Sequence, residues 1–257
     1  NSGTIKDAAG NNVTLTLPGL GGVGSLANNK ALVIDGVVPM VNSVSANTID
    51  GYYKAGDTLV VTVAFSEIVA VTGVLQLVLE TGINNAVIFY TGGSGTTTLN
   101  FNYIIESGHN NSDLDYVNTN SLSLINGLIR DVAGNDANLT LLEPGSSGSL
   151  SANKALIVDA IIPTVSSVSS TTLDSIYNIG DTLVITVNFP ETMVVDTSGG
   201  KPQLSLETGS VNAVVDYTSG SGSTVLSFHY IIIQDHTSED LDYTGTAALT
   251  LNGGIIR

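Results

Sequence analysis

Apolar and polar residues alternate in three stretches of the chain, residues 58–65, 75–81 and 98–104. A period of two is the pattern of a β-strand with one buried and one exposed face. The alternation predicts a core face made of Leu59, Val61, Val63, Phe65, Leu75, Leu77, Leu79, Leu99, Phe101 and Tyr103. No convincing helical period competes with it, so we expect an all-β fold.

Clusters of Gly, Asn, Asp and Ser separate these stretches, as in residues 81–86, 91–97 and 106–113. Such clusters are typical of the short turns between antiparallel strands. About seven or eight strands in each stretch of roughly 124 residues predict an immunoglobulin-like antiparallel β-sandwich. A β-barrel is the all-β alternative, but repeated modules joined at a proline favour sandwiches in series.

The chain repeats itself. Residues 7–35 align without a gap with residues 131–159 and are identical at 16 of 29 positions. Pro39 recurs as Pro163, and the phrase DLDY at residues 113–116 recurs at residues 240–243. We therefore expect three parts: residues 1–35, the C-terminal part of a preceding repeat; residues 36–159, a complete repeat; and residues 160–257, a following repeat that lacks its C-terminal strands.

Composition excludes several classes of function. The 257 residues carry 23 acidic and 7 basic side chains, a net charge of −16 that would repel nucleic acid. There is no cysteine, so the chain has no disulfide, thiolate metal site or cysteine nucleophile. The longest apolar runs are interrupted by Asp35 and Asp159 and are far shorter than the roughly 20 residues of a membrane-spanning helix. We expect no membrane insertion.

A series of phrases in a fixed order resembles a known group of proteins. They are residues 50–71, LETG, GSGTTTLNFNY, DLDY, residues 126–141 and residues 158–168. Together they resemble the tandem immunoglobulin-like repeats of large bacterial surface adhesins and other secreted multi-repeat proteins. The resemblance covers the whole chain, although the chain lacks the dense Asp-Asn linkers of cadherins.

The resemblance implies an extracellular protein at a bacterial cell surface. It implies a non-enzymatic stalk or filament segment whose partners are neighbouring repeats of the same chain. In many proteins of this group calcium stiffens the stalk.

Oxygen-bearing side chains that recur in both copies are candidate calcium ligands, because hard divalent cations bind six to eight oxygens. The candidates are Glu67, Glu191, Asp113, Asp115, Asp240, Asp242, Asp7, Asn11, Asp131, Asn135, Asp35 and Asp159. The alternation places Asp113 and Asp115 on one side of an extended segment. With Glu67 and Glu191 in a loop after the second strand, an up-and-down strand order predicts that Asp113, Asp115 and Asp159 of one repeat face Glu191 of the next.

The phrase D-x-A-G-N, at residues 7–11 and 131–135, has two interpretations. As a turn, its Asp accepts backbone hydrogen bonds, its Gly takes a positive φ and its Asn tolerates the left-handed region. As a cation site, the same Asp and Asn supply oxygens. Repetition does not decide between them, because turns repeat as faithfully as sites do.

The few side chains suited to catalysis do not form a known motif. Of the three histidines, His109 and His236 lie in polar loops and are expected at the surface, and His229 is expected on the outward face of a strand. No nucleophile elbow, HExxH or phosphate-binding glycine motif is present, so we expect no enzyme.

Two alternatives to a stalk stay open. A carbohydrate-binding module would present aromatic rings, but Trp is absent and only Tyr52, Tyr53 and Tyr177 fall in exposed loops. A self-assembling subunit of an extracellular filament or sheath would join identical chains, for example through an edge strand at residues 85–91.

Overall fold

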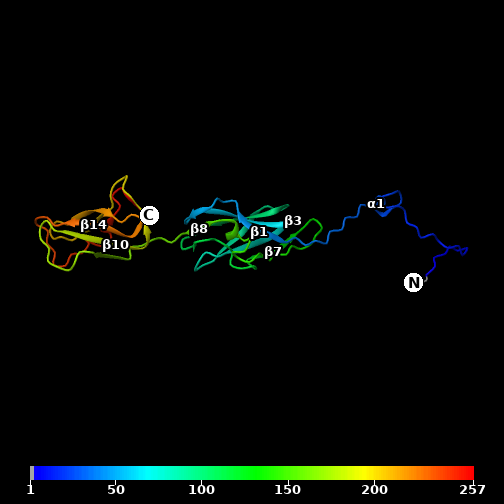
Figure 1. The fold of residues 1–257 in the computed structure, drawn as a ribbon, viewed down its shortest axis with the longest axis horizontal. Helices are drawn as coiled ribbons and strands as arrows, with labels where there is room; N and C mark the ends of the chain where they lie inside the picture. Colours follow the sequence, from blue (N-terminus) through cyan, green and yellow to red (C-terminus); the bar gives the residue numbers. More distant parts are fainter. Residues whose placement is uncertain (1–2) are drawn as a thin grey trace. The chain divides into compact units, whose positions relative to one another are not determined.

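The computed structural model describes residues 3–257 and is all-β, with several antiparallel sheets consistent with a β-sandwich (Figure 1). It divides into two compact units, Asn1–Ala160 and Ile161–Arg257. The described helices are two single turns, α1 (Leu26–Asn29) and α2 (Leu150–Asn153), each capped by a serine hydroxyl. No helix in residues 3–257 is long and apolar enough to cross a membrane.

The first unit is built around one long strand, β3. Its strands are β1 (Val41–Ala46), β2 (Gly51–Tyr53), β3 (Thr58–Leu79), β4 (Ala86–Gly92), β5 (Thr96–Ile104), β6 (Asn110–Asn111), β7 (Leu122–Arg130) and β8 (Leu156–Asp159). β3 pairs in antiparallel fashion with β1, β4, β5 and β7. A small separate sheet places β8 between β2, to which it is parallel, and β6.

β3 changes partners along its length. Its first residues, 58–64, pair with β1 and β5, and residues 70–79 pair with β7 and, near the end, with β4. The register with β5 shifts between Ala64 and Val69. The predicted loop after a strand ending at Phe65 was therefore wrong: Glu67 lies inside β3, because a bulge bends a strand without ending it.

The second unit repeats much of this arrangement. Its strands are β9 (Ser167–Ser170), β10 (Thr182–Met193), β11 (Val195–Asp196), β12 (Gln203–Leu206), β13 (Ala213–Ser219), β14 (Ser223–Ile231), β15 (Leu249–Thr250) and β16 (Ile255–Ile256). Six of them form one sheet in the order β15-β12-β13-β14-β10-β9, and β11 pairs with β16.

The predicted core face is confirmed. The residues at the alternating positions of β3 and β5 are all at most 3% exposed and pack in one cluster with Leu114, Tyr116, Leu141 and Leu150. The predicted edge strand at residues 85–91 corresponds to β4, which pairs with both β3 and β5.

Residues 3–39 contain no strand, and their apolar side chains are largely exposed.

Candidate metal centre

The phrase at residues 131–135 forms a tight turn directly after β7. Asp131 Oδ1 accepts hydrogen bonds from the backbone nitrogens of Gly134 (2.6 Å) and Asn135 (2.8 Å). Gly134 has a φ of 97°, a conformation that glycine adopts without strain. The phrase is therefore a turn, with Asp131 itself buried in the protein.

Asn135 ties this turn to the segment that precedes β1. Its Nδ2 donates to Asp131 Oδ2 (2.7 Å) and lies 3.2 Å from the carbonyl oxygens of both Asp35 and Val37. The backbone nitrogen of Asn138 adds a bond to the carbonyl of Pro39 (2.8 Å). These contacts hold residues 35–39 against the end of β7.

Three carboxylates meet beside this turn. One oxygen each of Asp35, Glu67 and Asp131 lie within 4.8 Å of one another. Asp35 comes from the segment before β1, Glu67 from the bulge of β3, and Asp131 from the turn after β7. The pairing of Ala70 with Arg130 brings the last two together, because the residue after β7 then lies near the residues that precede Ala70.

This acidic triad, Asp35, Glu67 and Asp131, has unfavourable electrostatics on its own. Glu67 Oε1 is buried and has no hydrogen-bond partner. Burial, together with the charges of Asp35 and Asp131, raises the pKa of Glu67. Burial also acts to raise the pKa of Asp131, but the hydrogen bonds from Asn135 and the turn backbone outweigh it and lower that pKa.

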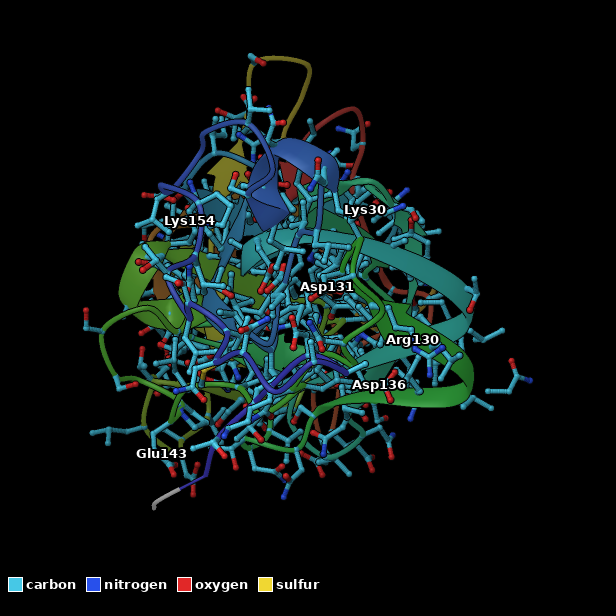
Figure 2. All side chains as sticks on the ribbon, turned by 90° about the vertical axis from the view of Figure 1, so that its right-hand side faces the viewer. Lys30, Arg130, Asp131, Asp136, Glu143 and Lys154 are labelled. Carbon is cyan, nitrogen blue, oxygen red and sulfur yellow. The ribbon has the colours of Figure 1, made fainter. Side chains whose placement is uncertain are left out.

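Arg130, the basic residue next to Asp131 in the sequence, is already engaged. It is the last residue of β7, and its Nε lies 2.5 Å from Asp136 Oδ1 (Figure 2). Carboxylates that share a small volume repel each other unless something neutralises them. A hard cation with oxygen ligands suits this arrangement.

The other candidates of the first unit lie elsewhere. Asp113 is exposed, and its backbone nitrogen donates to Asn111 Oδ1 (2.8 Å). Asp115 is buried and accepts hydrogen bonds from Gly145 N (2.9 Å) and Ser151 Oγ (2.7 Å). These bonds attach the loop before α2, and α2 itself, to Asp115. The segment around Asp113 is a bend and not an extended strand, so the expected alternation does not apply there.

The first copy of the turn stands alone. Asp7 Oδ1 accepts from Ala9 N (3.0 Å) and Asn11 N (2.9 Å), and Asn11 Nδ2 donates to Asp7 Oδ2 (2.9 Å). The hydrogen bonds from Asn11 lower the pKa of Asp7. Both residues are exposed, and among residues 3–257 Asp7 belongs to no group of three acidic side chains like that of Asp131.

The remaining candidates are spread over four positions. Asp159 ends β8 opposite Asn110. Glu191 lies in β10, and its Oε1 is also buried without a hydrogen-bond partner. Asp240 and Asp242 are exposed, and Asp242 Oδ1 accepts from Tyr243 N (2.7 Å).

The structure thus groups the acidic residues differently from the sequence expectation. Glu67 meets Asp131 and Asp35, and Asp113 and Asp115 are not part of that group. What the sequence prediction lacked was the pairing of β7 with β3. Because β7 is antiparallel to β3 and ends at Arg130 beside Ala70, the next residue, Asp131, lies near Glu67.

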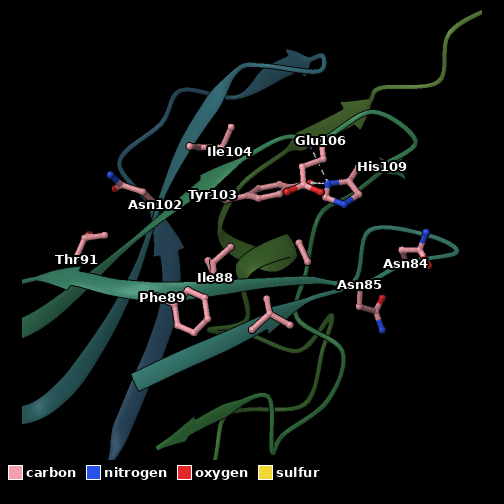
Figure 3. A pocket seen from close by; sticks show the side chains of 12 residues that line it. Asn84, Asn85, Ile88, Phe89, Thr91, Asn102, Tyr103, Ile104, Glu106 and His109 are labelled. Atoms are coloured by element: carbon pink, nitrogen blue, oxygen red, sulfur yellow. Dashed lines mark hydrogen bonds between the residues drawn. The ribbon is translucent and has the colours of Figure 1, made fainter. Parts of the chain in front are cut away.

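His109 is buried, so its predicted surface position was wrong. Its ring packs on Tyr103, and its Nδ1 accepts from Glu106 N (3.2 Å) and lies 2.8 Å from the Tyr103 hydroxyl (Figure 3). Burial raises the pKa of Tyr103. His236 makes the same contact with Tyr230 (2.9 Å), and His229 is exposed as predicted. His109 and His236 thus have local structural partners.

No protein-family model matches the chain, and no curated protein does either.

Proposed function

We propose that the chain is a non-enzymatic, extracellular structural segment of a large bacterial surface adhesin. In this proposal tandem immunoglobulin-like sandwiches form a stalk, and calcium bound at the acidic triad stiffens it. The observation that carries the proposal is the meeting of Asp35, Glu67 and Asp131 around a buried, unpartnered Glu67 oxygen.

The origin of the three residues supports a role at a junction. In the sequence repeat Asp35 ends one repeat, whereas Glu67 and Asp131 belong to the body of the next. A cation held by all three would clamp the connecting segment, residues 35–39, to that body. The hydrogen bonds of Asn135 and Asn138 already hold this segment in place. The ion would therefore strengthen an attachment that exists without it.

A thermal melt of the whole chain in calcium and in chelator tests the proposal. An ion that binds only the folded state adds about 2.7 kcal/mol of stability at 100 times its dissociation constant. We expect calcium to raise the melting temperature of the wild type, and Glu67→Gln to abolish most of that rise. Glu106→Gln, which removes an exposed carboxylate of the same unit outside the triad, should leave the rise unchanged.

Two results would contradict the proposal. One is a wild-type melting temperature that millimolar calcium does not change. The other is a calcium response that survives in Glu67→Gln, which would place the ion away from the triad.

A further inference from the structure

A groove of about 370 Å³ opens on the first unit where β4 and β5 separate. The two strands pair from Tyr90 and Phe101 onward, whereas residues 86–89 of β4 pair with β3. Within residues 3–257 no strand pairs with residues 102–104 of β5 on the side of β4, and Figure 3 shows the two strands diverging toward Glu106. The volume of the groove falls within the range of about 300–1,000 Å³ that is common for ligand sites.

The edge of β5 turns backbone groups into this groove. Val60 of β3 lies opposite Asn102. Its N donates to Thr48 Oγ1 (2.8 Å) and its carbonyl accepts from Asn47 N (2.9 Å), so Val60 bonds on the side away from β5. Successive residues of an antiparallel strand alternate in the side to which their backbone groups point. The N–H and C=O of Ile104, two residues after Asn102, therefore point away from β3 and into the groove.

The edge of β4 has the same property. Val78 of β3 lies opposite Val87. Its N donates to the Ser121 carbonyl (3.0 Å) and its carbonyl accepts from Val117 N (3.2 Å), so Val78 bonds on the side away from β4. The N–H and C=O of Val87 therefore also point into the groove. Each of the two edges thus offers a backbone donor and a backbone acceptor, the groups that bind an added β-strand.

The second unit repeats this divergence of two strands. β13 pairs with β12 through residues 213–216 and with β14 from Tyr217 onward. His229, the equivalent of Asn102, donates its N–H to Thr218 Oγ1 of β13 (3.2 Å). Backbone groups at this position of the strand therefore point toward the diverging neighbour. The opening follows from the register of the strands, which is the same in both units.

Apolar side chains border the backbone groups on the outer face of the groove. Val87, Phe89 and Ile104 are 49%, 49% and 63% exposed. Side chains at alternate positions of an added strand would lie on the same face and cover them. An extended peptide uses both these apolar side chains and the backbone groups of the strand edges, whereas a glycan has no need of the strand-like spacing of the backbone groups.

Charge restricts the sequence of such a peptide. Among the described residues that line the groove, the acidic side chain is that of Glu106, which is exposed at the end where the strands diverge (Figure 3). The chain as a whole has a net charge of −16 and therefore repels acidic partners. A Lys or Arg of the peptide would be attracted to Glu106.

We propose that the groove between β4 and β5 binds an extended peptide segment of another protein, which adds a strand between Val87 and Ile104. Apolar residues at alternate positions of the peptide cover Phe89 and Ile104, and a Lys or Arg of the peptide pairs with Glu106. The groove shares no residue with the acidic triad, so the proposal does not depend on calcium and can be tested in chelator.

A library of random heptapeptides displayed on phage, selected on the whole chain in chelator, supplies the probe. Enriched peptides should alternate apolar and polar residues and contain a Lys or Arg. Hydrogen exchange of the chain with a synthetic selected peptide then locates the contact. The amides of Val87 and Ile104 should exchange at least about tenfold more slowly in the complex, because they gain hydrogen bonds. The amide of Ile88, which already faces β3, should change little.

Two outcomes of this experiment would overturn the proposal. One is a selection that enriches no peptide. The other is a bound peptide that leaves the exchange of the Val87 and Ile104 amides unchanged, because such a ligand would contact side chains without adding a strand.

Val87→Pro tests the same contact by affinity. Proline removes the N–H that faces the groove and no bond to β3, a position at which an edge strand tolerates it. Val87→Thr keeps the N–H and the branched side chain and is the matched control. Val87→Pro should weaken binding of the selected peptide at least about tenfold, and Val87→Thr should bind it as the wild type does. Glu106→Gln should weaken it about twofold to fivefold. Equal affinity of Val87→Pro and the wild type would overturn the proposal.

A second copy of the chain is the competing occupant, and sedimentation velocity without peptide distinguishes it. The wild type should stay monomeric at the concentrations used for hydrogen exchange. Association that increases with concentration and is abolished by Val87→Pro would overturn the proposal, since the edges would then pair with another copy.

Discussion

The two D-x-A-G-N turns have nearly the same internal hydrogen bonds but very different surroundings. In both, the Asp accepts from the backbone of the following residues, and the Asn side chain returns a bond to the Asp. Asp7 is exposed and belongs to no group of three acidic side chains in the described residues 3–257, whereas Asp131 is buried beside Glu67 and Asp35. The turn is therefore encoded locally, and the candidate site is created by what packs against it.

This difference separates what forms the turn from what forms the triad. The five residues are sufficient for the turn, because the exposed copy forms it without tertiary support. They are not sufficient for the triad, which also needs the bulge of β3 and the connecting segment before β1. A variant of each turn therefore has its own matched control in the other copy.

The largest expected effect is that of Asp131→Asn in calcium. Asparagine keeps an acceptor oxygen for the turn but removes a charge from the triad, so the variant should lose the stability that calcium adds. That increment is about 2.7 kcal/mol at 100 times the dissociation constant. Denaturant unfolding in calcium and in chelator measures it. Asp7→Asn should unfold as the wild type does, and an equal loss in both variants would show that the surroundings of Asp131 do not matter.

Replacement of the turn glycine should have the next largest effect. Gly134 and Gly10 both have positive φ, 97° and 87°, and an added Cβ would meet no atom within 4 Å at either site. The cost is then the left-handed conformation alone, about 1–2 kcal/mol. Gly134→Ala should lower the unfolding free energy of the first unit by that amount, with or without calcium.

Gly10→Ala is the control for this prediction. Since the turn at residues 7–11 is exposed and supports no packed element, its loss should leave the main unfolding transition unchanged. A transition that shifts as much in Gly10→Ala as in Gly134→Ala would mean that the first turn is coupled to the core.

A smaller effect is expected from Asn135→Ala. The variant removes the contacts of Nδ2 with the carbonyls of Asp35 and Val37, and an ordinary hydrogen bond contributes about 0.5–1.5 kcal/mol. Hydrogen exchange of the amides of residues 35–39 should become faster. Asn11→Ala should not change that exchange. Unchanged exchange of residues 35–39 in Asn135→Ala would show that Asn135 does not hold this segment in place.

The smallest effect is a pH dependence that belongs to Glu67. Because its pKa is raised in the folded chain, the folded state binds more protons than the unfolded state just above the ordinary value of 4.5. In chelator the contribution of Glu67 to stability should therefore decrease as pH rises through this window. Glu67→Gln should remove that decrease in a series of melts, and an identical pH profile in both proteins would contradict the raised pKa.

Much of the fold could be predicted from the sequence, because the alternation that marks a buried face is a local property. Leu59, Leu77 and Phe101 follow it and are buried. The bulge at Glu67 could not be predicted in this way, since the residues after Phe65 break the period as a loop would. Only the pairing of β3 with β5 and β7 shows that the strand continues.

The candidate site was predictable in its members and not in its grouping. Asp35, Glu67 and Asp131 stood out as recurring acidic residues, but their meeting depends on the register between β3 and β7 and on the path of the connecting segment. The burial of His109 was missed for a similar reason, because its polar neighbours in the sequence give no sign of the Tyr103 ring on which it packs.

The most direct test of the account is a calorimetric titration of calcium into the wild-type chain and into Asp35→Asn, Asp131→Asn and Asp7→Asn. The account predicts a binding event in the wild type that is unchanged in Asp7→Asn and lost or strongly weakened in both Asp35→Asn and Asp131→Asn. Absence of binding to the wild type, or equal binding to all four proteins, would contradict the claim that the triad is a calcium site.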